Sequence, residues 1–434
     1  MNTGETGIAA VGGGSSYHAP PDGQTAGDTP VSAPQSTISA KPAIPPIARM
    51  APAAPIRASQ KPGSDAGGSG PIYGALDLGT NNCRLLVARP SRRGFFVIDA
   101  FSRIIKLGEG VSHSGLLSEE AMVRTIAALK VCSAKMGRRG VTRSRLVATE
   151  ACRVARNGPE FIARVKRETG LSLEIIARET EARLAVSGCA SLIDKQSDYA
   201  LIFDIGGGSS EFVWLNLTQG RRSKRISIED RLRIQESIEA WTSLPFGVVT
   251  LAERFGNSFV EGHQFEDMVS FVQEKLLPFN DHNGIAAKMS GSGTHLLGTS
   301  GTVTTIAGVY LGLSEYHRAK VDGCWLSTES IRQVSKRIAA MNYQERAAEP
   351  CIGIERADLI LAGCAIMEAM LRIWPVRSLR VADRGLREGI LATLIAEDVI
   401  HERNRNAKNG GVSEGLDAIS LIHDHSRTKS RAIP

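Results

Sequence analysis

The stretch "LIFDIGGGSSEFVW", Leu201 to Trp214, joins two apolar runs through three consecutive glycines. Short apolar runs bounded by glycine are typical of β-strands, so the stretch predicts a hairpin that turns at Gly206, Gly207 and Gly208. Because these residues have no side chains, their backbone N–H groups can converge on an oxyanion. On this segment alone, an ordinary glycine hairpin is the alternative.

Carboxylates flank the predicted turn. Asp204 precedes the glycines and Glu211 follows them, with Ser209 in between. On paired strands the two carboxylates would lie near each other beside an anion site. This arrangement suits Mg²⁺, which takes a few carboxylates and shares phosphate oxygens of a substrate. The stretch is not a P-loop, because no Lys-Ser/Thr pair follows the glycines and a strand rather than a helix comes next.

A related pattern occurs earlier in the chain. "LDLGTNNCRLLV", Leu76 to Val87, and "FDIGGGSSEFVW", Phe203 to Trp214, both place an aspartate, a glycine and small polar residues between apolar runs. Such a duplicated unit suggests a ligand held between two related domains. Alone, the first copy would be explained by a type I′ turn, since asparagine tolerates positive φ. The candidates in the first copy are Asp77 for a metal, and Gly79, Thr80, Asn81 and Asn82 for phosphate.

A third loop of small residues opens a helical pattern in "LLGTSGTVTTIAGV", Leu296 to Val309. The N-terminus of a helix attracts anions through its unpaired N–H groups and the helix dipole. An ordinary helix with a threonine cap is the alternative for this segment. The candidate phosphate-binding residues here are Gly298, Thr299, Ser300, Gly301 and Thr302.

The organisation of the chain favours two domains between two tails. A chain of 434 residues exceeds what one hydrophobic core usually supports. Between the tails, apolar runs of strand length alternate with helical patterns, which indicates an α/β fold. The segments 1–70 and 404–434 are poor in large apolar residues, so we expect both to be disordered.

The overall charge limits the classes of partner. A formal net charge of +7 fits a polyanionic substrate. Nucleic acid is not favoured, because the basic stretch "RRSKRISIEDRLRIQ", Arg221 to Gln235, includes acids and no aromatic residue. The chain has neither the pattern of a signal peptide nor an apolar run of the roughly 20 residues that a membrane helix needs. Its seven cysteines lack metal-site spacing, and we expect reduced thiols in a cytoplasmic protein.

Six segments together resemble the exopolyphosphatase and guanosine pentaphosphate phosphohydrolase family, from about Ile72 to Ile400 and in the expected order. They are "YGALDLGTNN", "ATEACR", "ETEARLAVSG", "LIFDIGGGSSEF", "GTSGTV" and "VADRGLREGIL". The resemblance implies an α/β fold of two actin-like (ribonuclease H-like) lobes with a central cleft. We expect the first lobe to cover 71–196 together with a closing helix at about 380–403, and the second to cover 197–379.

The resemblance also implies roles for single residues. Glu181, in "ETEARL", matches a catalytic acid that orients or deprotonates the attacking water, and Arg153, in "ATEACR", matches an arginine that faces the phosphates. Asp204 and Glu211 match carboxylates that bind metal and phosphate. From the residues alone, Glu181 would be a first-turn acid that complements a helix dipole, and Arg153 a solvated charge. The implied cofactor is Mg²⁺, with Mn²⁺ as an alternative, and the implied assembly is a homodimer.

The implied activity is hydrolysis of a terminal phosphoanhydride, with release of orthophosphate from inorganic polyphosphate, pppGpp or both. Two alternatives stay open: an ATPase or phosphotransferase of the actin-like or sugar-kinase type, and a non-catalytic sensor of guanosine tetra- or pentaphosphate. Longer family members carry an additional C-terminal region of the HD type, for which the polar sequence after about Asp398 leaves no room. We therefore expect short polyphosphates or pppGpp as substrates rather than processive digestion of long chains.

Overall fold

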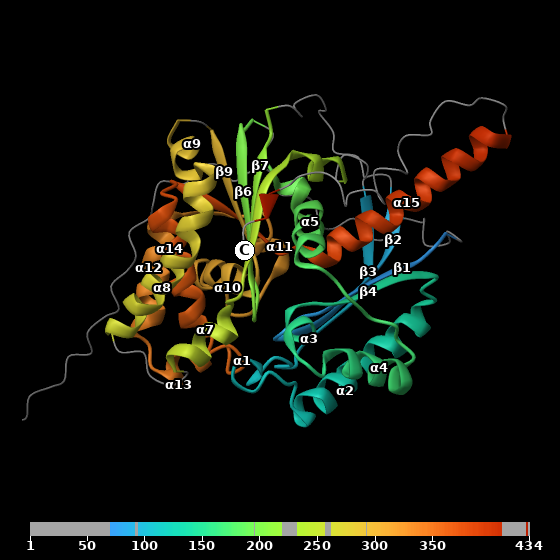
Figure 1. The fold of residues 1–434 in the computed structure, drawn as a ribbon, viewed down its shortest axis with the longest axis horizontal. Helices are drawn as coiled ribbons and strands as arrows, with labels where there is room; N and C mark the ends of the chain where they lie inside the picture. Colours follow the sequence, from blue (N-terminus) through green and yellow to red (C-terminus); the bar gives the residue numbers. More distant parts are fainter. Residues whose placement is uncertain are drawn as a thin grey trace, which may run out of the picture. The chain divides into compact units, whose positions relative to one another are not determined.

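The chain was analysed as a computed structural model (Figure 1). Most of the two expected tails and of the basic stretch at 221–235 lie outside the residues that the structure describes. The described residues are 70–91, 94–194, 196–218, 232–256, 262–291, 293–409 and 431–432.

The first sheet has the strand order β3-β2-β1-β4-β5. In it, β1 pairs antiparallel with β2 and parallel with β4. Helix α2 begins as predicted at the cap Ser118, whose side chain accepts a hydrogen bond from the N–H of Ala121 at 3.2 Å. The strands are β1 (Tyr73–Leu78), β2 (Asn82–Ser91), β3 (Gly94–Ile104), β4 (Arg143–Ala148) and β5 (Glu174–Ile175), and the helices that follow them are α1 (Val111–Ser114), α2 (Glu119–Arg139), α3 (Glu150–Val154), α4 (Gly158–Thr169), α5 (Arg178–Cys189) and the 3₁₀ turn η1 (Ala190–Leu192).

The second sheet has the order β10-β11-β9-β6-β7-β8-β12 and repeats the pairing of the first. Here β6 pairs antiparallel with β7 and parallel with β9, as β1 does with β2 and β4. The duplication predicted from the two aspartate motifs is therefore present in the topology. The strands are β6 (Tyr199–Ile205), β7 (Ser210–Asn216), β8 (Ile238–Leu244), β9 (Thr294–Thr299), β10 (Trp325–Ser327), β11 (Ser378–Ala382) and β12 (Arg431–Ala432).

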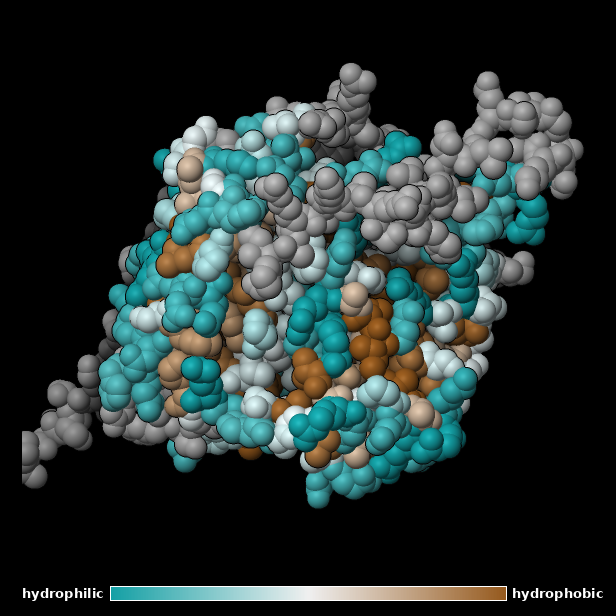
Figure 2. Space-filling view, viewed as in Figure 1, coloured by the Kyte–Doolittle hydropathy of each residue, from teal (hydrophilic) through white to brown (hydrophobic). Residues whose placement is uncertain are grey.

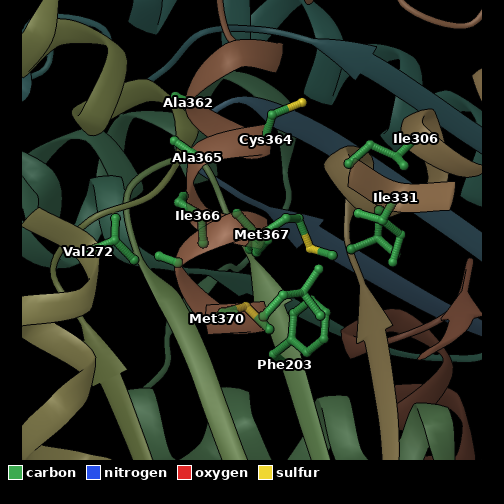
Figure 3. Packing of buried hydrophobic residues seen from close by; sticks show 14 of the residues in the cluster. Phe203, Val272, Ile306, Ile331, Ala362, Cys364, Ala365, Ile366, Met367 and Met370 are labelled. Atoms are coloured by element: carbon green, nitrogen blue, oxygen red, sulfur yellow. The ribbon is translucent and has the colours of Figure 1, made fainter. Parts of the chain in front are cut away.

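Helices cover the second sheet around a large apolar core. Helix α14 lies at its centre, where Ile366 and Met370 pack near Phe203 of β6 and Val272 of α8 (Figure 3). The elements of this half are η2 (Ile234–Ser237), α7 (Val248–Phe255), α8 (Gly262–Asn283), α9 (Ile285–Gly291), α10 (Gly301–Tyr310), α11 (Arg318–Val321), α12 (Thr328–Ala340), α13 (Tyr343–Ala348) and α14 (Ile360–Ile373).

Helix α5 lies between the two sheets, and α15 (Leu386–Asn409) packs against α5 and the first sheet. Leu184 of α5 packs with α15 and β1, whereas Val186 of the same helix packs with β6 and β9. Two glycines allow the close approach of these helices: a Cβ on Gly188 would lie 1.9 Å from the carbonyl oxygen of Gly385, and one on Gly389 would lie 1.9 Å from that of Leu184. The second half of α5 is thereby fixed against the start of α15.

The C-terminal segment differs from the sequence-based expectation in its bounds. The stretch that starts at Val381 was expected to be helical throughout, but β11 continues to Ala382 and α15 begins only at Leu386. The helix then extends to Asn409, past the predicted start of the tail. The turn between them forms because the N–H of Gly385 donates to the Glu388 carboxylate at 3.0 Å and caps the helix.

The fold class is the predicted one, an α/β protein with two actin-like sheets. The exact lobe boundaries stay predictions. Among the described residues, no helix is long and apolar enough to cross a membrane. On the face shown in Figure 2, hydrophilic residues separate the hydrophobic areas of the described surface.

Candidate active site

The two predicted turns have the same backbone closure. The N–H of Gly79 donates to the carbonyl oxygen of Asn82 at 2.9 Å, and the N–H of Gly206 donates to that of Ser209, also at 2.9 Å. Positive φ occurs at neither Asn81 nor Asn82, both of which are described, so the first copy is not a type I′ turn. Each turn is a short link between paired strands, and the pair is an internal repeat.

The glycines of the second turn allow it to approach the first turn closely. A Cβ on Gly207 would lie 3.0 Å from the Cβ of Thr80, and one on Gly208 would lie 2.7 Å from the Thr80 hydroxyl oxygen. A Cβ on Gly208 would also lie 3.2 Å from Cγ of Glu150. A side chain at Gly208 would force its neighbours to shift, and one at Gly207 would be tightly packed, so the absence of side chains lets the two turns meet across the sheets.

A cavity of about 110 Å³ lies where the two turns and the start of α10 come together. Most of the predicted site residues line it. They are Asp77, Gly79, Thr80, Asn81, Asn82, Glu181, Asp204, Gly206, Gly207, Gly208, Ser209, Glu211, Ser300, Gly301 and Thr302.

Two predicted residues of the third loop do not line this cavity. Gly298 and Thr299 belong to strand β9 instead of the loop. A Cβ on Gly298 would lie 2.4 Å from the ring of Phe203, so close packing against this ring accounts for a glycine at this position. The Thr299 hydroxyl donates to the carbonyl oxygen of Arg384 at 2.9 Å. The cavity is lined instead by the next residues, beginning with Ser300.

Ser300 is strained. Its φ is 142° and its ψ is 170°, a region that non-glycine residues rarely adopt and that costs about 1–3 kcal/mol. Its side chain accepts a hydrogen bond from the N–H of Val303 at 3.2 Å and caps α10. Because Gly301 and Thr302 line the cavity, the N-terminus of α10 lies at its wall, as the third-loop hypothesis requires.

Glu181 lies in the first turn of α5 and lines the cavity, whereas Arg153 lies behind it. Nη2 of Arg153 lies 2.6 Å from Oε2 of Glu181, and Nη1 lies 2.5 Å from Oε2 of Glu150. Arg153 is on helix α3 rather than at a strand end, because β4 stops at Ala148. Its predicted contact with phosphate stays a prediction, but the guanidinium is already paired with two carboxylates.

The acids of the cavity have raised pKa values. Burial raises the pKa of Asp204 to about 7, with Arg84 opposing the shift, and burial followed by the charge of Asp204 raises the pKa of Glu211 to about 7. Burial also raises the pKa of Asp77. The pKa of Glu181 is held well above its usual value by burial first and then by the negative charge of Glu211. In the structure, nearby positive charges do not offset the burial and mutual repulsion of these carboxylates.

Two arginines in the cavity wall were not among the predicted site residues. Arg84 and Arg356 both line the cavity, and a Cβ on Gly301 would lie 4.0 Å from the guanidinium group of each. Neither forms an ion pair with a described residue; among these residues the guanidinium of Arg356 donates to the Thr305 hydroxyl, at 3.1 Å. Burial, followed by the charge of Arg84, lowers the pKa of Arg356. Two guanidinium groups held this close favour an anion between them.

A sequence signal existed for only one of these arginines. Arg84 belongs to the first repeat and lies opposite Asp77 in the register of β1 and β2. Arg356 lies in the link before α14, and nothing in its local pattern marks it as a site residue.

A larger cavity of about 530 Å³ adjoins the first. Both are lined by Thr80, Glu150 and Gly208. The larger cavity extends toward α1 and α7, where Arg254 lies over the ring of Phe271 at 4.4 Å from its centroid.

Two related strand-turn-strand units, with carboxylates and arginines around one cavity, define an α/β protein of actin-like fold. The chain belongs to the Ppx/GppA phosphatase family, because the model of this family matches residues 86–397. Family membership assigns the chain to the phosphatases.

Solved structures agree with this assignment. The Ppx/GppA family member from Aquifex aeolicus is 28% identical, with a TM-score of 0.60, over 76% of this chain and 98% of that chain. An exopolyphosphatase-like protein is 26% identical, with a TM-score of 0.64, over 74% of this chain and 97% of that one. An exopolyphosphatase from Cytophaga hutchinsonii, at 24% identity, shares the fold with a TM-score of 0.65 over 75% of this chain and 98% of that one.

Proposed function

We propose that this phosphatase hydrolyses the terminal phosphoanhydride of inorganic polyphosphate, pppGpp or both and releases orthophosphate. The observation that supports this most is the position of Glu181, which lines the same cavity as both turns and the start of α10. A carboxylate beside three groups of anion-binding N–H donors can act on a water molecule next to a bound phosphate.

In this proposal the residues of the cavity have separate roles. The turns at Gly206–Ser209 and Gly79–Asn82 hold the terminal phosphate, while Arg84 and Arg356 neutralise the phosphates that follow it. Glu181 orients the water in line with the bond to be broken and accepts its proton, which its raised pKa favours. Positioning and electrostatics supply most of the rate in such reactions. The adjoining cavity of about 530 Å³ offers room for the remainder of the substrate.

The carboxylates fit a divalent cation, Mg²⁺ or Mn²⁺. Glu211 is buried and Asp204 half-buried; they lie opposite each other and have raised pKa values, so a positive charge between them would relieve both desolvation and repulsion. Among the described residues, however, no three His, Cys, Asp or Glu side chains form a metal site on their own. We infer that Asp204 and Glu211, with Asp77 nearby, would hold the cation together with water and phosphate oxygens. When bound, it would neutralise charge on the phosphoryl group.

The test is release of orthophosphate from polyphosphates of graded length and from pppGpp, each with and without Mg²⁺, beside ATP. We expect release from at least one of the first two substrates, only with the metal, and a preference over ATP. Absence of release from both would contradict the proposal, and preferential turnover of ATP would favour an ATPase instead.

The proposal includes a homodimer, because dimers are usual in the family that the sequence resembles. Sedimentation equilibrium of the full chain at micromolar concentration measures this directly, and a monomer mass would contradict it.

A further inference from the structure

Two short sequence elements, "EACR" at Glu150–Arg153 and "RETE" at Arg178–Glu181, each place an arginine and a glutamate three residues apart. Both occur in the first turns of helices that follow neighbouring parallel strands, α3 after β4 and α5 after β5. Residues at i and i+3 lie on one side of a helix. The two helix starts therefore present four charges of alternating sign to each other.

These four charges form one chain of ion pairs. Arg178 contacts Glu150 through Nη2, 2.6 Å from Oε1, and through Nε, 3.2 Å from Oε2. Arg153 contacts the same Glu150 at 2.5 Å and Glu181 at 2.6 Å. The order is Arg178, Glu150, Arg153, Glu181, and only the last member is the proposed base.

The guanidinium of Arg153 is held on three sides. Besides the two carboxylates, its Nε donates to the carbonyl oxygen of Ile176 at 3.0 Å, at the end of β5. A planar group with three fixed contacts has little freedom to turn toward a phosphate. Arg153 does not line the cavity, whereas Arg84 and Arg356 do. Arg153 is thus placed to hold Glu181.

The contact with Arg153 also determines how Glu181 is used. Oε2 of Glu181 accepts from Arg153, and no described residue donates a hydrogen bond to Oε1. With one oxygen fixed, the other is free for a water molecule in the cavity. A small displacement of such a group can cost about 100-fold in rate.

We propose that Glu150 and Arg178 are positioning residues, which fix Arg153 and through it the carboxylate of the base Glu181. This inference rests on the proposed function for Glu181. Arg178 is the most exposed member, with 37% of its side chain accessible, and it is farthest along the chain of contacts from Glu181, so it is the best position to test.

The first test compares Arg178→Ala with the wild type in steady-state phosphate release. We expect kcat to fall about 10-fold or more while KM changes less than about twofold, because the phosphate-binding groups are untouched. Arg178→Lys should recover only part of kcat, since an ammonium cannot form the two-nitrogen contact. Millimolar guanidinium should restore part of the activity of Arg178→Ala. An unchanged kcat, or a loss that appears in KM alone, would overturn the inference.

Glu179→Gln is the matched control on the same helix. Glu179 pairs with Arg183 at 2.9 Å, is 39% exposed, and takes no part in the chain of four charges. This variant should keep wild-type kcat and KM. A loss equal to that of Arg178→Ala would mean that any lost ion pair on α5 has the same effect, and would overturn the inference as well.

A second measurement does not depend on activity. Urea midpoints of Arg178→Ala, Glu181→Gln and the double variant form a double-mutant cycle. Because Arg178 and Glu181 also attract each other directly across one turn of α5, the cycle is repeated in the Arg153→Met background. We expect non-additive midpoints that become more additive in this background; additive midpoints in the wild-type background, or the same coupling without Arg153, overturn the inference. If the wild type releases no phosphate, the proposed function fails while this cycle still decides whether the four charges are coupled.

Discussion

Asp204 on β6 lies directly opposite Glu211 on β7. In the first repeat the same register brings Asp77 opposite Arg84. The two repeats thus have the same backbone but different charges: an acid pair in one and an acid with a base in the other. The cavity between them is therefore lined by the carboxylates of Asp77, Asp204 and Glu211 together with the guanidinium of Arg84.

The acid pair predicts how stability depends on pH. Burial raises the pKa of both Asp204 and Glu211 to about 7, above the roughly 4 of an unfolded carboxyl. The folded state then holds more protons than the unfolded state between these values, so its stability falls as pH rises from about 4 to about 7. We expect the metal-free protein to melt several degrees lower at pH 8 than at pH 5, as measured by calorimetry in EDTA.

Two further measurements distinguish ionisation of Asp204 and Glu211 from general effects of pH on stability. Mg²⁺ should raise the melting midpoint at pH 8 more than at pH 5, because only the ionised pair attracts it. Asp204→Asn should reduce the dependence on pH, since it removes one of the two charges. An equal dependence in the variant and the wild type would show that other groups are responsible.

Glu181→Gln should lose most of the activity and keep substrate binding. The amide has nearly the same shape but cannot accept a proton, and a general base contributes about 10²- to 10⁴-fold. We expect kcat to fall by that factor with little change in the dissociation constant of a slowly turned-over substrate, measured by calorimetry. Near-normal turnover at saturating Mg²⁺ would contradict the role of Glu181.

Gly208→Ala should open the contact between the two turns. The added Cβ would lie 2.7 Å from the Thr80 hydroxyl oxygen, closer than atoms in contact can come, so one turn must move. We expect kcat/KM for phosphate release to fall by at least about 10-fold. Gly79→Ala is the comparison, because its Cβ would lie at an ordinary 3.5 Å from the nearest atom, the carbonyl oxygen of Asn82. Equal losses in both variants would argue against contact between the turns as the cause.

Arg356→Ala should weaken substrate binding more than it slows the reaction. A charged hydrogen bond contributes about 1.5–3 kcal/mol, so losing one to a phosphate should raise KM about 10- to 100-fold. Arg337→Ala on α12 is a suitable control, since Arg337 is 53% exposed and, among the described residues, forms its ion pair with Glu349. A fall in kcat at constant KM would instead indicate that Arg356 acts in the chemical step.

The sequence allowed the repeats and most of the cavity to be predicted because both depend on local patterns. The hairpin around Gly206 can be predicted from its apolar runs and glycines alone. The related unit at Leu76–Val87 could then be recognised by alignment with it. Arg356 could not be found this way, since only the packing of the link before α14 brings it to Arg84. Arg153 itself was predicted from the sequence, but its pairing with Glu150 and Glu181 is recognisable only once β4 and β5 are known to be neighbours.

The contact between α5 and α15 provides a prediction that links stability to the site. Gly389→Ala would place a Cβ 1.9 Å from the carbonyl oxygen of Leu184, and overpacking of this kind costs about 1–3 kcal/mol. Because α5 begins with the residues that pair with Glu150 and Arg153, its displacement should lower kcat as well as the urea midpoint. Gly137→Ala is the control: it lies in α2 with no atom within 4 Å of the added Cβ, and should be neutral or slightly stabilising. If Gly389→Ala lowered the midpoint but left kcat unchanged, the position of α5 would not determine the geometry of Glu181.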